Sequence, residues 1–261
     1  MARWGVVMIA SVIRVTLVAL FLTPLIAPLV TPLAASAQES RQDKPQDTSK
    51  DTSQATSPQD TAQDTPGQFD FYVLSLSWSP SFCAQAAERH ADRSAGPQCG
   101  ARPYYFVVHG LWPQYDKGFP EYCQQPSPRL YHGIVSSMLD LMPAPHLIFN
   151  EWDKHGTCSG LMPSAYFDTV RKARAAVKIP PDYVDVPEPL TVTPAAVEDA
   201  FIKANPGLKP SGMAIGCDNK RLTEVRLCLS KDLQFHDCAE IAKRSCRRDQ
   251  VLMPPVRGGN G

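Results

Sequence analysis

Two short segments of the chain place titratable side chains beside glycine and tryptophan. Residues 109–113 read His-Gly-Leu-Trp-Pro, and residues 151–158 read Glu-Trp-Asp-Lys-His-Gly-Thr-Cys. If the second segment is helical, Glu151 and His155 lie one turn apart on one face, with Lys154 beside them. A carboxylate there can orient an imidazole and tune its pKa, and an ammonium group offers a positive charge to an anion. The pattern predicts acid–base chemistry by four residues: His109, Glu151, Lys154 and His155.

A structural role is the alternative for both histidines, which would then cap the ends of a strand and a helix. Two observations favour chemistry. Both histidines occur in motifs that contain glycine and tryptophan, and a merely structural helix gains nothing from a cation at Lys154. The other histidines lack such surroundings, and we expect them to be structural or at the surface: His90, His132, His146 and His236.

The sequence contains no recognisable pattern for a metal ion or a cofactor. Glu151 and His155 form a Glu-x-x-x-His pair, but the metalloprotease signature requires two histidines four residues apart. The 261 residues contain no Cys-x-x-Cys, which argues against a zinc ribbon and against a thioredoxin-like redox site. We therefore expect neither a metal nor a cofactor.

The first 37 residues are typical of an export signal. They contain Arg3 and Arg14, no acidic residue, and an apolar stretch at 15–33 that is followed by Ala-Ser-Ala. An uncleaved membrane anchor is the alternative, because the apolar stretch approaches the length of a span, although three prolines interrupt it. We expect a signal peptide at 1–37, export to the periplasm or the extracellular space, and no stable membrane anchor after cleavage.

The eight cysteines all follow this segment. An even number of cysteines in an exported chain predicts four disulfide bonds. The cysteines are Cys83, Cys99, Cys123, Cys158, Cys217, Cys228, Cys238 and Cys246.

Composition divides the remainder of the chain. Residues 38–67 are rich in Gln, Asp, Thr and Ser, contain a recurring Asp-Thr pair, and predict a disordered spacer. A single folded domain is expected at 68–254, followed by a flexible tail at 255–261. The chain has 26 basic and 26 acidic residues, so a nucleic acid would have to bind in a local groove rather than through a global basic field.

Within the domain, hydrophobic spacing predicts both helices and strands. Strands are expected at 69–78, at 104–108 with His109 at its end, and at 222–229. Helices are expected at 131–142, 166–177 and 194–204, the last with Thr193 as its N-cap and Pro194 at its first position. This order favours an α+β fold with a mixed, mainly antiparallel sheet and packed helices.

The two motifs resemble the active-site signatures of the ribonuclease T2 family, and the resemblance extends from Phe71 to about Cys246. It implies endonucleolytic cleavage of single-stranded RNA through a 2′,3′-cyclic phosphate, then hydrolysis to a 3′-phosphate. It makes His109 and His155 the acid–base pair, and Glu151 and Lys154 the groups that stabilise the transition state. Trp112 is then part of a base-stacking wall. No metal is needed, because the ribose supplies the nucleophile.

Two positions depart from the family pattern. Asn150 stands where many members have a third histidine that holds phosphate, and Gln114 stands where many have an aspartate that contacts the base. The Asn150 amide can donate a hydrogen bond to phosphate but adds no charge. The alternative is that Asn150 caps the helix that carries Glu151. We expect Trp112, Asn150 and Gln114 to bind substrate.

The resemblance also implies a pairing of the cysteines. The expected bonds are Cys83–Cys99, Cys123–Cys158, Cys217–Cys246 and Cys228–Cys238. The second would tie the loop after His109 to the loop after His155 and hold both imidazoles across one cleft. A monomer with no obligate protein partner is expected.

Two other functions are compatible with the sequence. A secreted, catalytically weak member of the same fold would act by binding, with Asn150 as a sign of decay. A metal-dependent hydrolase would be inhibited by EDTA, although no acidic pair or His–Cys set has suitable spacing. RNA cleavage that resists EDTA excludes both.

Overall fold

The computed structural model describes residues 65–89, 96–100 and 102–256, which all belong to one structural unit. The predicted signal peptide, most of the predicted spacer and His90 lie outside these residues. Over the described ranges, none of the helices has the length and apolar character needed to cross a bilayer.

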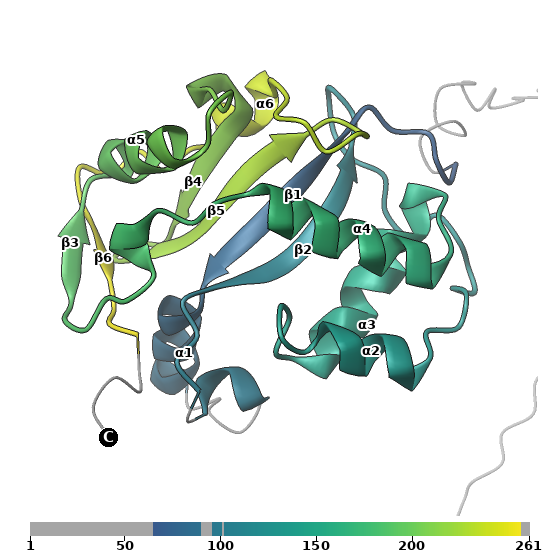
Figure 1. Cartoon of the computed structure of the whole chain (residues 1–261), viewed down its shortest axis with the longest axis horizontal. Coiled ribbons are helices and arrows are strands. Elements are labelled where there is room, and N and C mark those ends of the chain that lie inside the picture. Colours follow the sequence, from purple (N-terminus) through teal and green to yellow (C-terminus); the bar gives the residue numbers. More distant parts are fainter. Residues whose placement is uncertain (1–64, 90–95, 101, 257–261) are drawn as a thin grey trace, which may run out of the picture. The chain divides into compact units, whose positions relative to one another are not determined.

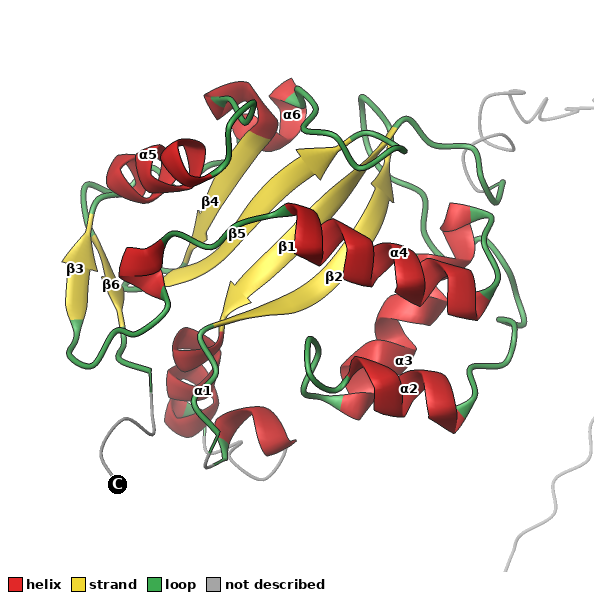
Figure 2. Cartoon of the chain, viewed as in Figure 1, coloured by secondary structure: helices red, strands yellow, loops and turns green. Residues whose placement is uncertain are grey.

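A four-stranded antiparallel sheet forms the centre of the fold, as Figures 1 and 2 show. Its strand order is β2-β1-β5-β4, with β1 at Phe71–Trp78, β2 at Phe106–Gln114, β4 at Met213–Cys217 and β5 at Leu222–Leu229. A second, two-stranded sheet pairs β3, Leu190–Val192, with β6, Val251–Met253. The predicted α+β fold is confirmed.

Six α-helices are seen in the described part of the chain. They are α1 (Ser79–Glu88), α2 (His132–Met138), α3 (Pro145–Lys154), α4 (Pro163–Ala176), α5 (Pro194–Ala204) and α6 (Ala239–Ala242). Proline opens α3, α4 and α5, where its missing N–H costs no helical hydrogen bond. The Thr193 hydroxyl accepts a hydrogen bond from the Ala196 amide at 3.0 Å, which confirms the predicted N-cap of α5.

One predicted helix ends earlier than its hydrophobic spacing suggests. The expected helix at 131–142 becomes α2, which ends at Met138 and is followed by a turn. The Leu141 carbonyl then accepts a hydrogen bond from the Val108 amide of β2 at 2.9 Å. Because β2 is an edge strand, this tertiary contact satisfies a backbone donor that the sheet leaves free.

The two faces of the sheet differ in character. The main core lies on one face, where α4 crosses β1 and β2 and contributes Tyr166, Phe167 and Val170 (Figure 1). The opposite face carries a small apolar cluster that includes Val73 and Cys228, with Trp112 packed against it. Antiparallel register places polar side chains on this second face as well.

Strand β2 differs from its prediction in a way that matters for His109. The strand was expected to end before Gly110, but it continues to Gln114, so His109 lies inside it. Pro113 is tolerated there because β2 is at the edge of the sheet.

A β-bulge falls at His109. Ser75 pairs with Gly110 and Leu76 pairs with Val108, so the extra residue on β2 is His109, which has no pairing partner among the described residues of β1. Val108 and Leu111, on either side of the bulge, both belong to the main core. The bulge therefore lets two consecutive residues, His109 and Gly110, lie together on the opposite face, and bulges are common beside functional sites.

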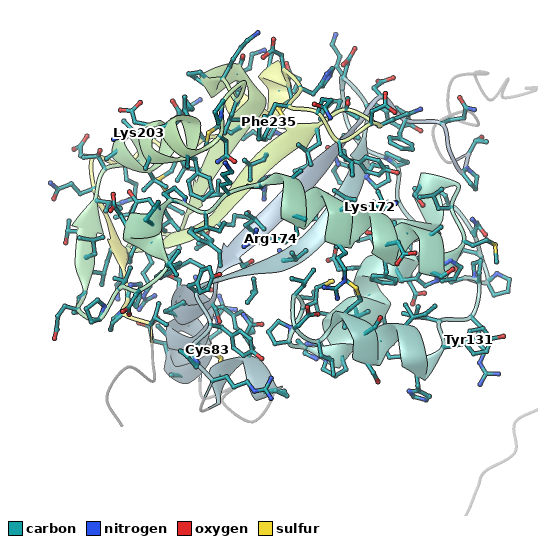
Figure 3. All side chains as sticks on the ribbon, in the orientation of Figure 1. Cys83, Tyr131, Lys172, Arg174, Lys203 and Phe235 are labelled. Carbon is teal, nitrogen blue, oxygen red and sulfur yellow. A yellow bond between two sulfur atoms is a disulfide. The ribbon has the colours of Figure 1, made fainter. Side chains whose placement is uncertain are left out.

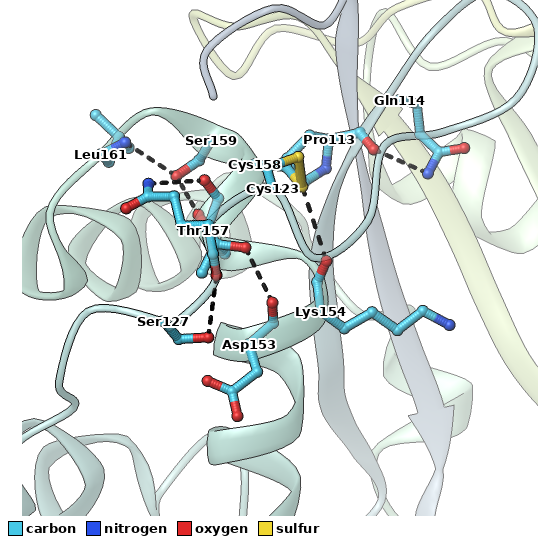
Figure 4. Close-up of a disulfide and its surroundings, with 12 residues drawn as sticks. Pro113, Gln114, Cys123, Ser127, Asp153, Lys154, Thr157, Cys158, Ser159 and Leu161 are labelled. Atoms are coloured by element: carbon cyan, nitrogen blue, oxygen red, sulfur yellow. Dashed lines mark hydrogen bonds between the residues drawn. A yellow bond between two sulfur atoms is a disulfide. The ribbon is translucent and has the colours of Figure 1, made fainter. Parts of the chain in front are cut away.

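Four disulfides join all eight cysteines in the pairs that the family resemblance implies: Cys83–Cys99, Cys123–Cys158, Cys217–Cys246 and Cys228–Cys238. Figure 3 shows Cys83 on α1. Figure 4 shows the Cys123–Cys158 bond beside the end of α3. Next to this bond, the Tyr122 amide donates a hydrogen bond to the Lys154 carbonyl at 2.8 Å.

We predict that the Cys123–Cys158 bond holds the segment around Tyr122 against α3. The variant C123A/C158A should unfold with a free energy about 2–4 kcal/mol lower, because the bond closes a loop between residues 35 apart. The Tyr122 amide should also exchange with solvent much faster, which hydrogen exchange measures. The matched control, C83A/C99A, removes a bond between residues 16 apart and should leave exchange at Tyr122 unchanged. Equal exchange at Tyr122 in the two variants contradicts the prediction.

Candidate active site

His109 lies between two carboxylates that come from different elements. Its Nε2 is 3.6 Å from Oε1 of Glu151 on α3, and its Nδ1 is 3.8 Å from Oε2 of Glu224 on β5. These distances are within ion-pair range and longer than a normal hydrogen bond. The imidazole lies near both carboxylates, and it is still 39% exposed to solvent.

The Glu151 side chain of α3 contacts β2. It is buried, and its Oε2 accepts a hydrogen bond of 2.6 Å from Nε1 of Trp112. Gly110 makes this approach possible, because a Cβ atom at that position would collide with the Glu151 carboxylate and the Trp112 indole. The glycine in the first motif is therefore required by the glutamate in the second.

His155 follows α3 directly as its C-cap, and its backbone N–H donates to the Glu151 carbonyl at 3.0 Å. The predicted one-turn spacing of Glu151 and His155 is therefore present. Its imidazole is buried, and Nδ1 has no hydrogen-bond partner among the described residues. Trp112 lies against both histidines, with ring centroids 5.3 Å from His109 and 5.4 Å from His155.

The two imidazoles have opposite electrostatic environments. Burial, Lys154 and His109 together lower the pKa of His155 to about 3. Burial also acts to lower the pKa of His109, but the carboxylates of Glu224 and Glu151 outweigh it and raise this pKa above its ordinary value. At mildly acidic pH, His155 is therefore neutral while His109 is protonated.

The side chains meet in a pocket of about 350 Å³. It is lined by His109, Trp112, Gln114, Phe119, Glu151, Lys154, His155, Arg226, Ile241 and Arg244. The Lys154 ammonium also forms an ion pair of 3.2 Å with Glu121, and it lies 5.9 Å from the centre of the Phe119 ring. Figure 4 shows the Lys154 side chain extended away from the neighbouring disulfide. The pocket thus combines two imidazoles, three permanent cations and two aromatic rings.

Most residues predicted for the site come together in this pocket, and Asn150 does not. Asn150 is exposed on α3, outside the described lining of the pocket. The alternative role as a helix cap is wrong, because α3 begins at Pro145 with Ala144 as its N-cap. Asn150 is an interior residue of the helix.

Sequence reasoning missed four residues of the site. Glu224 and Arg226 lie two residues apart on β5 and so share a face, a pattern that the alternation of 222–229 already contains. Phe119 and Arg244 lie outside regular strands and helices, and no periodicity pointed to them.

A metal site was not expected. In residues 65–89, 96–100 and 102–256, the His, Cys, Asp and Glu side chains form no cluster that could hold a metal ion.

The chain is similar in sequence to known ribonucleases. The profile of the Ribonuclease T2 family matches residues 69–238. A ribonuclease of Aeromonas hydrophila is 34% identical over 205 residues, which cover 73% of this chain and 88% of that protein. Ribonuclease DdI of Dictyostelium discoideum is 29% identical over 209 residues, covering 69% and 83%.

Solved structures show the same fold. An RNase-related protein from Calystegia sepium has a TM-score of 0.54 at 20% identity, covering 72% of this chain and 98% of that chain. RNase NT in complex with 5′-AMP has a TM-score of 0.51 at 24% identity, covering 72% and 99%. The family match confirms the resemblance that the two motifs indicate, and the chain belongs to the ribonuclease T2 family.

Proposed function

We propose that this protein is an exported endoribonuclease that cleaves single-stranded RNA through a 2′,3′-cyclic phosphate without a metal ion. The observation that carries the proposal is the presence, in one pocket of about 350 Å³, of two imidazoles whose pKa values are shifted in opposite directions. Pairs of titratable groups that differ in this way divide the acid and base roles between them.

His155 is the general base of the first step. Its lowered pKa keeps the imidazole neutral, so it can take the proton of the 2′-hydroxyl while the 2′-oxygen bonds to phosphorus. His109, which is protonated, donates a proton to the 5′-oxygen as the bond from phosphorus to that oxygen breaks. In the second step the roles reverse: His109 activates water, which opens the cyclic phosphate, and His155 returns its proton to the 2′-oxygen.

Lys154, Arg226 and Arg244 supply positive charge to the phosphate. All three line the pocket with the imidazoles, and fixed cations stabilise negative charge that grows on phosphoryl oxygens. Burial raises the pKa of Glu151 above its ordinary value. Glu151 also orients Trp112 through their hydrogen bond.

Base binding is assigned to Trp112, Gln114 and Phe119, which line the same pocket. Aromatic faces stack on unpaired bases, and Phe119 is 45% exposed. The amide of Gln114 offers both a donor and an acceptor. Asn150 would then contact only a part of the RNA that extends beyond the pocket.

Export to the periplasm or the extracellular space is supported by the four disulfides, because such bonds persist in oxidising compartments. A monomer is proposed, since the acid, the base and the cations of the site all come from one chain.

The direct test is chromatography of the products formed from a defined single-stranded oligonucleotide, with and without EDTA. We expect a cyclic phosphate that converts to a 3′-phosphate, at the same rate in both conditions. Binding without cleavage, or inhibition by EDTA, rejects the proposal.

The two histidine variants should lose activity while remaining folded. His109→Ala and His155→Ala should each reduce kcat by at least about a hundredfold, the typical contribution of one proton-transfer group. Circular dichroism would verify folding. His146→Ala is the matched control, because His146 is exposed on α3 and outside the pocket lining, and it should cleave RNA at the normal rate. If either site variant retains more than about a tenth of the rate, that imidazole has no role in the chemistry.

The pH dependence of kcat/KM should be bell-shaped and broad on the acidic side. The active form has neutral His155 and protonated His109, so the rate should fall only near pH 3 in acid. On the alkaline side, it should fall as pH rises through the raised pKa of His109. The measurement is kcat/KM from pH 2.5 to 9, corrected for the folded fraction at each pH. A rate that still increases above pH 8 contradicts this assignment of acid and base.

Asn150 should make only a modest contribution to kcat/KM. Asn150→Ala should change kcat/KM by no more than about tenfold, since a neutral hydrogen bond is worth about 0.5–1.5 kcal/mol. Asn150→His should be tolerated and should help more at pH 5 than at pH 8, because only the protonated imidazole attracts phosphate. Steady-state kinetics of both variants at the two pH values provides the measurement. A hundredfold loss in Asn150→Ala would place this residue in the chemistry.

A further inference from the structure

Glu224 is a carboxylate of β5 that neither motif contains. Its side chain is only 15% exposed. It contacts one side chain from each of β1, β2 and β5. Ser75 of β1 donates its hydroxyl to Oε2 at 2.6 Å, and Arg226 of β5 donates Nη2 to Oε1 at 2.5 Å. The third contact is Nδ1 of His109 on β2, at 3.8 Å from Oε2.

The ion pair with Arg226 does not by itself explain how the Glu224 carboxylate is held in place. A buried carboxylate is costly unless it is paired and hydrogen-bonded, and here two partners fix its oxygens in place. The Oε2 that accepts from Ser75 is also the oxygen that faces His109. The bulge places His109 on the face of the sheet that carries Ser75, and its Nδ1 lies 3.8 Å from this oxygen.

We propose that Glu224 is a positioning residue that holds the His109 imidazole through Nδ1–H, so that Nε2 carries the proton delivered to the leaving oxygen. This inference rests on the proposed function, in which His109 is the general acid. Nε2 is the nitrogen on the side of Glu151 and the pocket, whereas Nδ1 faces the sheet. A carboxylate on the second nitrogen fixes which nitrogen is available for chemistry and stabilises the imidazolium.

The charged groups around His109 act on its pKa in different directions. Glu151 of α3 and Glu224 of β5 favour the imidazolium, and Arg226 disfavours it. Burial raises the pKa of Glu151, so this carboxylate loses its charge more readily in acid. Glu224 differs: burial acts to raise its pKa, but His109, Arg226 and Ser75 outweigh burial and lower it to about 2. Glu224 therefore stays negative across the pH range in which the enzyme works.

The test compares pH profiles of kcat/KM for Glu224→Gln and the parent protein. Glutamine keeps the size of the side chain and can still accept from Ser75, but it removes the charge. The alkaline limb should move to lower pH by about one unit, the usual effect of losing one nearby opposite charge. At pH 8 the rate should then fall about tenfold, and near pH 5 it should stay within about threefold of the parent.

Two further variants separate electrostatics from folding. Arg226→Gln removes the cation that disfavours the imidazolium, so its alkaline limb should move to higher pH. Glu240→Gln is the matched control, because Glu240 pairs with Lys243 at 2.7 Å away from the pocket lining, and its profile should not move. A purely structural role for Glu224 would lower the rate equally at every pH.

Nuclear magnetic resonance of the imidazole nitrogens gives a second reading that does not depend on cleavage. In the parent protein, Nδ1 of His109 should carry a proton, and Glu224→Gln should lower the pH at which His109 titrates. An unchanged His109 titration in Glu224→Gln overturns the inference even if the protein cleaves RNA. Conversely, a shifted titration in a protein that never cleaves RNA supports the contact and rejects the proposed function.

Discussion

The site depends on the close approach of α3 to β2 at Gly110. This contact allows Glu151 to reach Trp112, and any side chain at position 110 would occupy the space of the carboxylate. The resulting hydrogen bond joins the two motifs, which are about 40 residues apart in the chain. Because His155 is the C-cap of the same helix, the approach also brings the second imidazole to the first. The Cys123–Cys158 bond lies beside the C-terminal end of α3.

The sheet determines where the His109 side chain lies in the site. The bulge at His109 falls between Val108 and Leu111, which both belong to the main core. With it, the side chain turns to the face that carries Ser75, Trp112 and Arg226. A single extra residue in an edge strand thus lets His109 and Gly110 lie on the same face of the sheet. Edge strands allow this more readily than central ones, since only one ladder of hydrogen bonds is interrupted.

Electrostatics then distinguishes two chemically identical side chains. His155 is enclosed and lies beside a lysine, so its charged form is disfavoured. His109 is only partly buried and lies between two carboxylates, so its charged form is favoured. The difference in pKa arises from the neighbouring groups rather than from the histidines themselves. Those neighbours come from α3 and β5 together. The position of the family's third histidine, here Asn150, lies outside this group of charges, and Arg226 and Arg244 line the pocket instead.

The sequence alone determined the residues of the two motifs, the helical spacing of Glu151 and His155, the α+β class and the cap of α5. These are local properties, which depend on residue type and on spacing over one or two turns or strands. It could not determine the bulge at His109, because a bulge depends on how β1 pairs with β2, and glycine and proline in 110–113 favoured an earlier strand end. It also could not place Glu224, Arg226, Phe119 and Arg244 beside the motifs. Those contacts join segments far apart in the chain, and only the packed sheet with α3 and α6 brings them within interaction distance. The division of charge between the two imidazoles follows from that packing, since burial and neighbouring charges are set by the tertiary structure and not by the motifs themselves.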